Sequence, residues 1–230
     1  MKFKAALALV LVAALSSCGG KKAVQAQAHF KLGVSYLSDG SLQPAFVEFQ
    51  KAAELDPDNK EVQNAIGVVY LRLQDYPNSE EAFKRATKID SDYSEAYNNL
   101  CFLYNTGRQW KKAVEQCRKA LKNPLYATPE KAFYNMGHAY YRLGMHDEAI
   151  EAYTDALRRA PVLYIAYYSL ALAHNAKGDY GQASTAITRG IELDPRFGGN
   201  RAKAEAGFKA EQAGAGEPKD FKDLIEILNY

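Results

Sequence analysis

The sequence predicts an all-α fold, a solenoid of five helix-turn-helix repeats followed by a C-terminal capping helical tail. Two observations carry this prediction. Apolar residues at helical spacing recur in phase between positions 26 and 197, and turn residues and prolines interrupt them at recurring places. With 47% hydrophobic and 24% charged residues, the composition is that of an ordered chain.

The first residues are typical of a signal peptide, which we place at residues 1–17. Lys2 and Lys4 form a short basic start, and an unbroken apolar run covers residues 5–15. That run is too short for a mature membrane-spanning helix, which needs about 20 residues. A cleaved leader is the better interpretation.

The segment Leu15-Ser16-Ser17-Cys18 resembles the lipobox of bacterial lipoproteins. The resemblance implies that Cys18 carries a covalent lipid and that residues 18–25 form a short tether. By similarity to Gram-negative sorting rules, Gly19 implies an outer-membrane protein that faces the periplasm. The alternative is an ordinary secretory signal with an incidental cysteine.

The mature chain has no net charge. Taking Lys2 and Lys4 from the 29 basic residues leaves 27, which equals the number of acidic residues. The sequence therefore gives no electrostatic sign of nucleic-acid binding or of membrane binding through a basic surface.

The predicted repeats cover residues 26–59, 60–93, 94–129, 130–163 and 164–197. Position 8 of each repeat is small, which lets the second helix approach the first closely: Gly33, Gly67, Cys101, Gly137 and Ala171. Positions 20 and 27 are also small in every repeat. Turns are expected at Asp39-Gly40, Gly107, Gly144 and Gly178-Asp179. Prolines near position 32 end the second helices of all repeats but the second, where Ser91 stands.

The tail, residues 198–230, departs from the repeat pattern. A helix is expected over residues 200–213, followed by a Gly-rich break. Asp220 can cap a last helix, whose apolar face consists of Phe221, Leu224, Ile225 and Leu228. This helix either caps the solenoid or docks a partner.

No catalytic or metal-binding constellation is present in the sequence. The four histidines lack metal-ligand spacing, and there is no phosphate-binding glycine loop and no nucleophile elbow. We therefore expect no enzymatic activity, no small-molecule substrate and no cofactor apart from the lipid on Cys18.

Cys101 and Cys117 occupy positions 8 and 24 of the third repeat, so both are expected to face the core between its two helices. Two interpretations remain open. They are either two small buried residues or a disulfide, which an oxidising compartment permits.

A second stripe on the first helices should line a concave, peptide-binding groove. The residues assigned to it are apolar, aromatic or amide-bearing, which suits a peptide ligand. They are Phe30, Val34, Leu37, Val68, Leu71, Asn98, Asn99, Phe102, Tyr134, Asn135, His138 and Tyr141. The alternative is that these residues bury against the solenoid itself or against the tail.

The repeat columns match the tetratricopeptide pattern, which implies a right-handed superhelical solenoid that binds proteins. The linker Pro124-Leu125-Tyr126-Ala127-Thr128-Pro129, two residues longer than in the other repeats, resembles that of the type IV pilus pilotins, the PilW/PilF group of lipoproteins. The Asn98-Asn99 pair also resembles that group. Two features depart from it. The family pattern has a glycine near the position of Cys101, and no sixth hairpin can be identified in the sequence after Phe197.

The resemblance implies a factor that helps the pilus secretin to reach the outer membrane and to assemble there. Its partner would be the secretin subunit. The alternative function is an adaptor that recruits peptidoglycan hydrolases or proteases.

Overall fold

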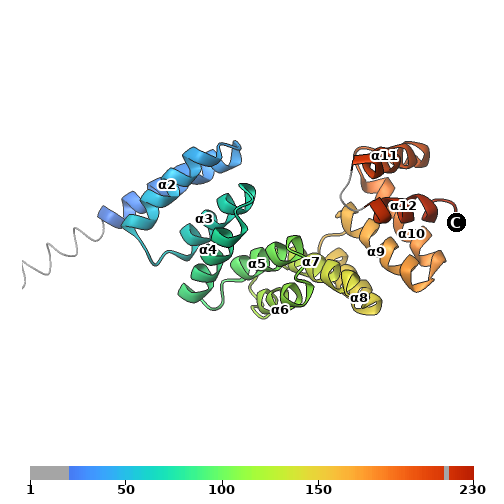
Figure 1. The fold of residues 1–230 in the computed structure, drawn as a ribbon, viewed down its shortest axis with the longest axis horizontal. Coiled ribbons are helices and arrows are strands. Elements are labelled where there is room, and N and C mark those ends of the chain that lie inside the picture. Colours follow the sequence, from blue (N-terminus) through green and yellow to red (C-terminus); the bar gives the residue numbers. More distant parts are fainter. Residues whose placement is uncertain (1–20, 215–217) are drawn as a thin grey trace, which may run out of the picture. The chain divides into compact units, whose positions relative to one another are not determined.

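The computed structural model describes residues 21–214 and 218–230, and within them every regular element is an α-helix. Cys18, Gly19 and the leader lie outside the described residues. A first helix covers residues 21–38. It is followed by α2 (Leu42–Leu55), α3 (Lys60–Arg72), α4 (Tyr76–Ile89), α5 (Ser94–Thr106), α6 (Trp110–Ala120), α7 (Pro129–Arg142), α8 (His146–Arg159), α9 (Tyr164–Lys177), α10 (Tyr180–Leu193), α11 (Arg201–Gly214) and α12 (Pro218–Ile227) (Figure 1). The prediction of an all-helical repeat fold is confirmed.

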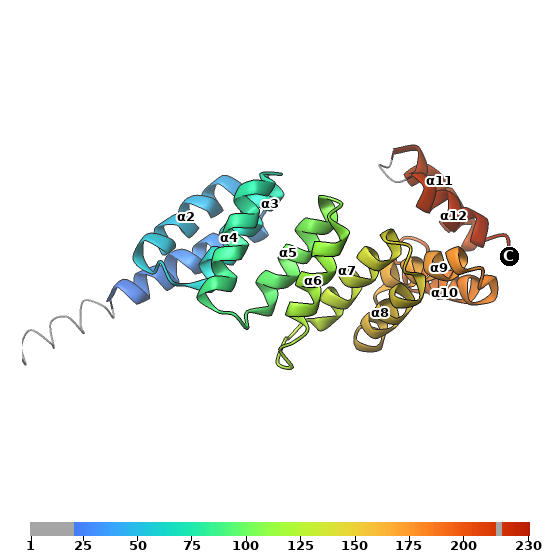
Figure 2. The ribbon, with the colours of Figure 1, turned by 60° about the horizontal axis from the view of Figure 1, so that its bottom comes forward.

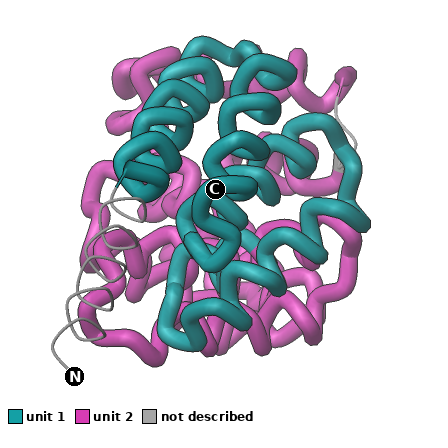
Figure 3. The backbone as a smooth tube through the Cα atoms, turned by 90° about the vertical axis from the view of Figure 1, so that its left-hand side faces the viewer, with its two compact units in different colours: residues 1–99 teal, residues 100–230 magenta. Residues whose placement is uncertain are grey.

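The chain divides into two compact units, residues 1–99 and residues 100–230 (Figure 3). In the first, the helix over residues 21–38, α2, α3 and α4 form antiparallel pairs around a core that contains Phe49, Val62 and Val69. In the second, α7 packs against α8 and α9 against α10 (Figure 2). The boundary falls within α5, and each unit is described by itself.

Small residues at position 8 allow the close packing of each hairpin, as the sequence predicted. A Cβ atom added to Gly67 would lie 2.6 Å from the ring of Phe83, and one added to Gly33 would lie 2.6 Å from the ring of Phe49. In the fourth hairpin, Gly137 meets the ring of Tyr153 in the same way, at 2.7 Å. Each ring belongs to position 24, so glycine makes room for an aromatic residue on the second helix.

Position 15 of every repeat adopts a left-handed backbone. Three of these residues are glycines, Gly40, Gly144 and Gly178, which adopt this conformation without steric cost. The other two are Gln74, with φ 60°, and Arg108, with φ 55°. In the third hairpin the left-handed residue is therefore Arg108, and not Gly107, where the sequence analysis placed the turn signal. A left-handed residue other than glycine is strained, because its Cβ crowds a carbonyl oxygen.

The tail folds back onto the fifth hairpin. Helix α12 packs against α9, α10 and α11, and buries Leu224, Ile227 and Leu228 in a cluster with Tyr168 and Leu172. Phe221 and Ile225 pack at its margin. The tail therefore covers an apolar face of the solenoid, which is one of the two roles left open by the sequence.

The expected role of Asp220 as a helix cap is wrong. Asp220 lies in the first turn of α12, and its carboxylate accepts hydrogen bonds from both terminal nitrogens of Arg142, at 3.3 and 2.5 Å. Both side chains are about four-fifths buried, since their exposed fractions are 17% and 19%. Asp220 therefore pairs with Arg142 of another helix and is not the N-cap residue of α12.

Candidate peptide-binding pocket

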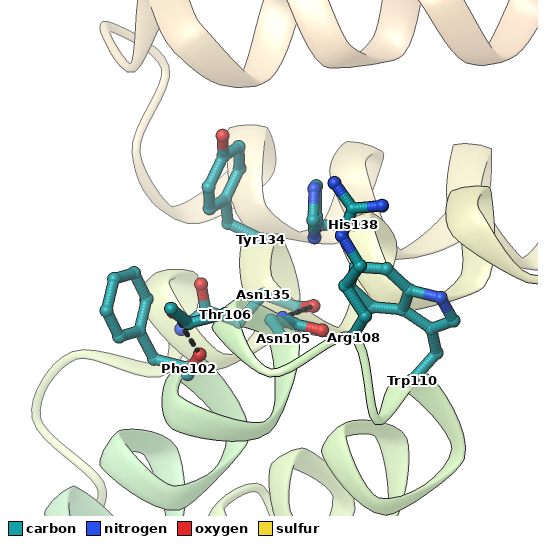
Figure 4. Close-up of a pocket in the computed structure, with 8 residues that line it drawn as sticks. All are labelled: Phe102, Asn105, Thr106, Arg108, Trp110, Tyr134, Asn135 and His138. Carbon is teal, nitrogen blue, oxygen red and sulfur yellow. Dashed lines mark hydrogen bonds between the residues drawn. The ribbon is translucent and has the colours of Figure 1, made fainter. Parts of the chain in front are cut away.

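A pocket of about 340 Å³ opens between the third and fourth hairpins, within the second unit (Figure 4). It is lined by residues of α5, of the α5–α6 turn, of the start of α6 and of α7. These residues are Phe102, Asn105, Thr106, Arg108, Trp110, Tyr134, Asn135 and His138. Because α5 and α7 are the first helices of their hairpins, the pocket lies on the stripe that the sequence assigned to the groove.

The base of the pocket is polar. Asn105 is 7% exposed, and its Nδ2 donates a hydrogen bond of 2.8 Å to the backbone oxygen of Asn135. Its Oδ1 has no hydrogen-bond partner among the described residues. A buried amide oxygen without a donor is costly, so this atom is a ready acceptor for an N–H group that enters the pocket.

Aromatic rings form the walls. Phe102 is 46% exposed on the α5 side. The Trp110 and His138 rings meet edge to face, with centroids 5.7 Å apart. His138 Nε2 also accepts a long hydrogen bond of 3.5 Å from Arg142 Nε. Rigid rings give a large contact area at a small entropy cost, which suits a pocket for a partner's side chain.

Tyr134 stands opposite Phe102 (Figure 4), and its ring lies 5.9 Å from that of Tyr153. Burial raises the pKa of Tyr134 above its ordinary value, and a hydrogen bond with Ser169 opposes this only in part. The phenol therefore stays neutral at physiological pH and can serve as a hydrogen-bonding group but not as an anion.

A disulfide links Cys101 and Cys117, whose Cα atoms lie 5.3 Å apart. Cys101 immediately precedes Phe102 on α5, and Cys117 lies on α6, which begins at Trp110. The covalent bond therefore ties together the two helices that contribute these pocket walls. Of the two interpretations left open by the sequence, the structure contains the disulfide.

The inner stripe of the next hairpin is not open. Helix α12 covers Tyr168 and Leu172, and Tyr141 packs at the edge of the same cluster. At the C-terminal end, Tyr230 Oη donates a 2.8 Å hydrogen bond to Asn175 Oδ1. Tyr141, which the sequence assigned to the groove, is therefore partly buried against this cluster.

The assigned residues of the first unit lie in several environments. Phe30 and Leu37 pack against the core, whereas Val34 is 41% exposed. Val68 and Leu71 are half-buried. Asn98 is buried, and Asn99 Nδ2 donates a 2.8 Å hydrogen bond to Asn64 Oδ1. These two amides are already engaged within the chain or shielded by it.

Four predicted residues, Phe102, Tyr134, Asn135 and His138, meet at the pocket, and sequence reasoning missed Arg108 and Trp110 as site residues. Arg108 belongs to the turn between the helices of one hairpin and Trp110 begins the second helix, so both lie outside the first-helix stripe that helical periodicity can identify. Within the described ranges we find no group of three or more side chains suited to a metal ion. None of the described helices is both long and apolar enough to cross a bilayer.

Comparison with known proteins identifies the repeats. Profiles described as "Tetratricopeptide repeat" match residues 26–59, 43–94, 130–161 and 164–197, more than half of the chain. The type IV pilus assembly protein PilF of Pseudomonas aeruginosa is 26% identical over 170 residues. This alignment covers 69% of the chain and 67% of PilF.

Two solved structures share the fold. The structure of Pseudomonas aeruginosa PilF superposes with a TM-score of 0.73 at 20% identity, over 87% of this chain and 88% of that one. The crystal structure of PilW, described as a widely conserved type IV pilus biogenesis factor, gives a TM-score of 0.70 at 22% identity, over 86% of this chain and 90% of that one. At this level of identity the structural likeness shows the fold alone.

Proposed function

This chain is a tetratricopeptide-repeat protein homologous to PilF, and from that premise we propose that it is a lipid-anchored scaffold that assists assembly of the type IV pilus secretin. Tetratricopeptide proteins bind protein partners and are generally not catalytic. The observation that supports a binding role here is the aromatic pocket between the third and fourth hairpins, with its unpaired Asn105 oxygen.

The location forms part of the proposal. The lipobox-like Leu15-Ser16-Ser17-Cys18 supports a lipid on Cys18, and Gly19 supports sorting to the outer membrane, with the repeats facing the periplasm. A secretin subunit must be held near that membrane until it forms a multimer. A scaffold that is anchored there needs no chemistry of its own, and we propose none.

The decisive experiment deletes the gene and measures heat-resistant secretin multimers in the outer membrane. Complementation with the wild type should restore them, whereas Cys18→Ala should not, because it removes the acylated residue. If multimers form normally in the deletion strain, the secretin role is wrong. An adaptor that recruits peptidoglycan hydrolases or proteases would then be the function to test.

A second experiment tests the pocket. We expect Phe102→Asp to weaken capture of the secretin subunit, because it places a charge on an aromatic wall. Leu125→Asp is the matched control, since Leu125 is 86% exposed on the α6–α7 linker and does not line the pocket. Equal capture by both variants would exclude the pocket as the binding surface.

A further inference from the structure

The protein's own tail shows which side chains its inner stripe accepts. Asp220 of α12 binds Arg142 through two hydrogen bonds, and the next residue, Phe221, packs against the apolar cluster. The guanidinium of Arg142 also lies over the Tyr141 ring, 5.4 Å from its centroid. An acidic residue followed by an aromatic residue is thus held by an arginine beside aromatic rings.

The pocket one hairpin earlier offers the same combination. Arg108 lies beside Trp110 and His138 on one side of the pocket, and Phe102 lines the other side, as Figure 4 shows. Among the described residues that line the pocket none carries a carboxylate, whereas Arg108 is a permanent cation. The charge of the walls therefore favours an anionic group over a cationic one.

Arg108 occupies its place against the preference of its backbone. Its φ of 55° lies in the left-handed region, and the equivalent residues of three other hairpins are glycines. Strained residues are kept mostly where the side chain has a task. At this position the side chain lines the pocket, which glycine could not do.

The base of the pocket supplies a matching acceptor. Oδ1 of Asn105 is buried without a hydrogen-bond partner among the described residues, while Nδ2 of the same amide is held by the Asn135 carbonyl oxygen. A flip of the Asn105 amide would break the hydrogen bond from Nδ2 to the Asn135 carbonyl oxygen. A backbone N–H of a bound segment would satisfy the oxygen.

We propose that this pocket binds a short partner segment in which an aspartate or glutamate side chain adjoins an aromatic residue. The carboxylate pairs with Arg108, the aromatic side chain packs between Phe102, Trp110 and Tyr134, and a backbone N–H reaches Asn105. This inference rests on the proposed scaffold function and specifies the partner's recognition segment. It commits to a side-chain carboxylate, as in the contact between Asp220 and Arg142.

The test uses the full-length chain in detergent and short peptides that lack tryptophan. Trp110 is the one tryptophan in the sequence and lines the pocket, so its fluorescence reports binding directly. The peptides are acetylated and amidated, so that an Asp-Phe peptide carries one carboxylate, on the aspartate. We expect this peptide to change the Trp110 emission and to bind about tenfold more tightly than its Asn-Phe counterpart, as for the loss of one charge-assisted contact.

Two protein variants separate the parts of the proposal. Arg108→Asn removes the charge at a residue type that tolerates the left-handed backbone, and should abolish the preference for Asp-Phe over Asn-Phe. Arg158→Gln is the control, because Arg158 is an exposed arginine that pairs with Asp155 and does not line the pocket. It should leave both affinities unchanged.

Several outcomes overturn the inference. They are equal binding of the Asp-Phe and Asn-Phe peptides, no binding of either, or binding only of an Asn-Phe peptide with a free terminal carboxylate. If secretin capture is still lost in Phe102→Asp, any of these results leaves the scaffold function standing. If capture does not involve the pocket but the Asp-Phe peptide binds, the pocket serves a different partner, and the deletion experiment alone decides the secretin role.

Discussion

Cys101 and Cys117 form a disulfide at the two positions of the third hairpin where three other hairpins place a glycine against an aromatic ring. The pairs Gly33–Phe49, Gly67–Phe83 and Gly137–Tyr153 fill the same space with one small and one large side chain. The third hairpin fills it with two medium-sized side chains joined by a covalent bond.

Reduction of the disulfide should destabilise the chain. The cysteines are separated by 16 residues, and closing a loop of that size is worth about 3 kcal/mol in the chain-entropy account. The measurement is urea unfolding with and without reductant, followed by circular dichroism. An unchanged midpoint would mean that the packing of two thiols suffices.

The double variant Cys101→Gly/Cys117→Phe should recover part of that loss, because it recreates the pair found in the first and second hairpins. The comparison is Cys101→Ser/Cys117→Ser, which buries two hydroxyl groups in an apolar site. If the serine variant is the more stable of the two, the proposed equivalence of the pairs is incorrect.

Gly67→Ala should destabilise the second hairpin, because the new methyl group would lie 2.6 Å from the Phe83 ring. Overpacking of this kind costs about 1–3 kcal/mol. Gly181→Ala is the control within a helix, since nothing lies within 4 Å of its added Cβ. It should be neutral or stabilising by up to about 1 kcal/mol. Thermal unfolding of both variants checks the contrast, and similar losses in both would rule out the steric explanation.

Arg108→Gly and Gln74→Gly should both leave stability unchanged or raise it by up to about 1 kcal/mol, because glycine relieves the left-handed strain and loses only part of that gain to chain entropy. Their effects on peptide binding should differ. Arg108→Gly should lose the preference for Asp-Phe over Asn-Phe and Gln74→Gly should keep it, since Gln74 does not line the pocket. A loss in both variants would point to a general effect of the turn.

Asp220→Asn should loosen α12 from the fifth hairpin, because it leaves the largely buried Arg142 without its anion. A charged hydrogen-bonded pair of this kind contributes about 2 kcal/mol. Amide hydrogen exchange in α12 should therefore become faster while exchange in α7 and α8 stays slow. Asp147→Asn, which removes an exposed pair with Lys177, should change nothing. Unaltered exchange in α12 would show that its apolar face alone holds it.

Acid should weaken the fifth hairpin through Asp194. Burial opposes ionisation of this carboxyl, but hydrogen bonds from Arg196 and Tyr168 outweigh it and hold the pKa below its ordinary value. A lowered pKa means stability that is present above the unfolded pKa, about 4, and is lost as the pH falls below it. The stability difference between wild type and Asp194→Asn should therefore shrink on acidification. A difference independent of pH would contradict this role.

The repeat fold could be predicted because its signals are local and recur. Gly33, Gly67 and Gly137 occupy the same position of their repeats, and each has the same physical reason for being small. Half of the pocket could be predicted for the same reason, since Phe102, Tyr134 and His138 lie on the stripe that helical periodicity identifies.

The rest depended on contacts that no local pattern encodes. Arg108 reaches the pocket because a left-handed backbone, normally indicated by glycine, occurs at an arginine. Asp220 resembled a helix cap, and its real partner, Arg142, lies 78 residues earlier in the chain. Periodicity shows which face of a helix is apolar, but not which later segment will cover it.

Repeat arrays unravel from their ends, because each repeat is supported only by its neighbours. A hairpin closed by a covalent bond cannot open in this way, so in an oxidising compartment fraying from either end stops at the bond between Cys101 and Cys117. Two pocket walls lie on the helices that this bond joins. Under thermal or mechanical stress, these two walls should therefore be the last part of the array to be lost.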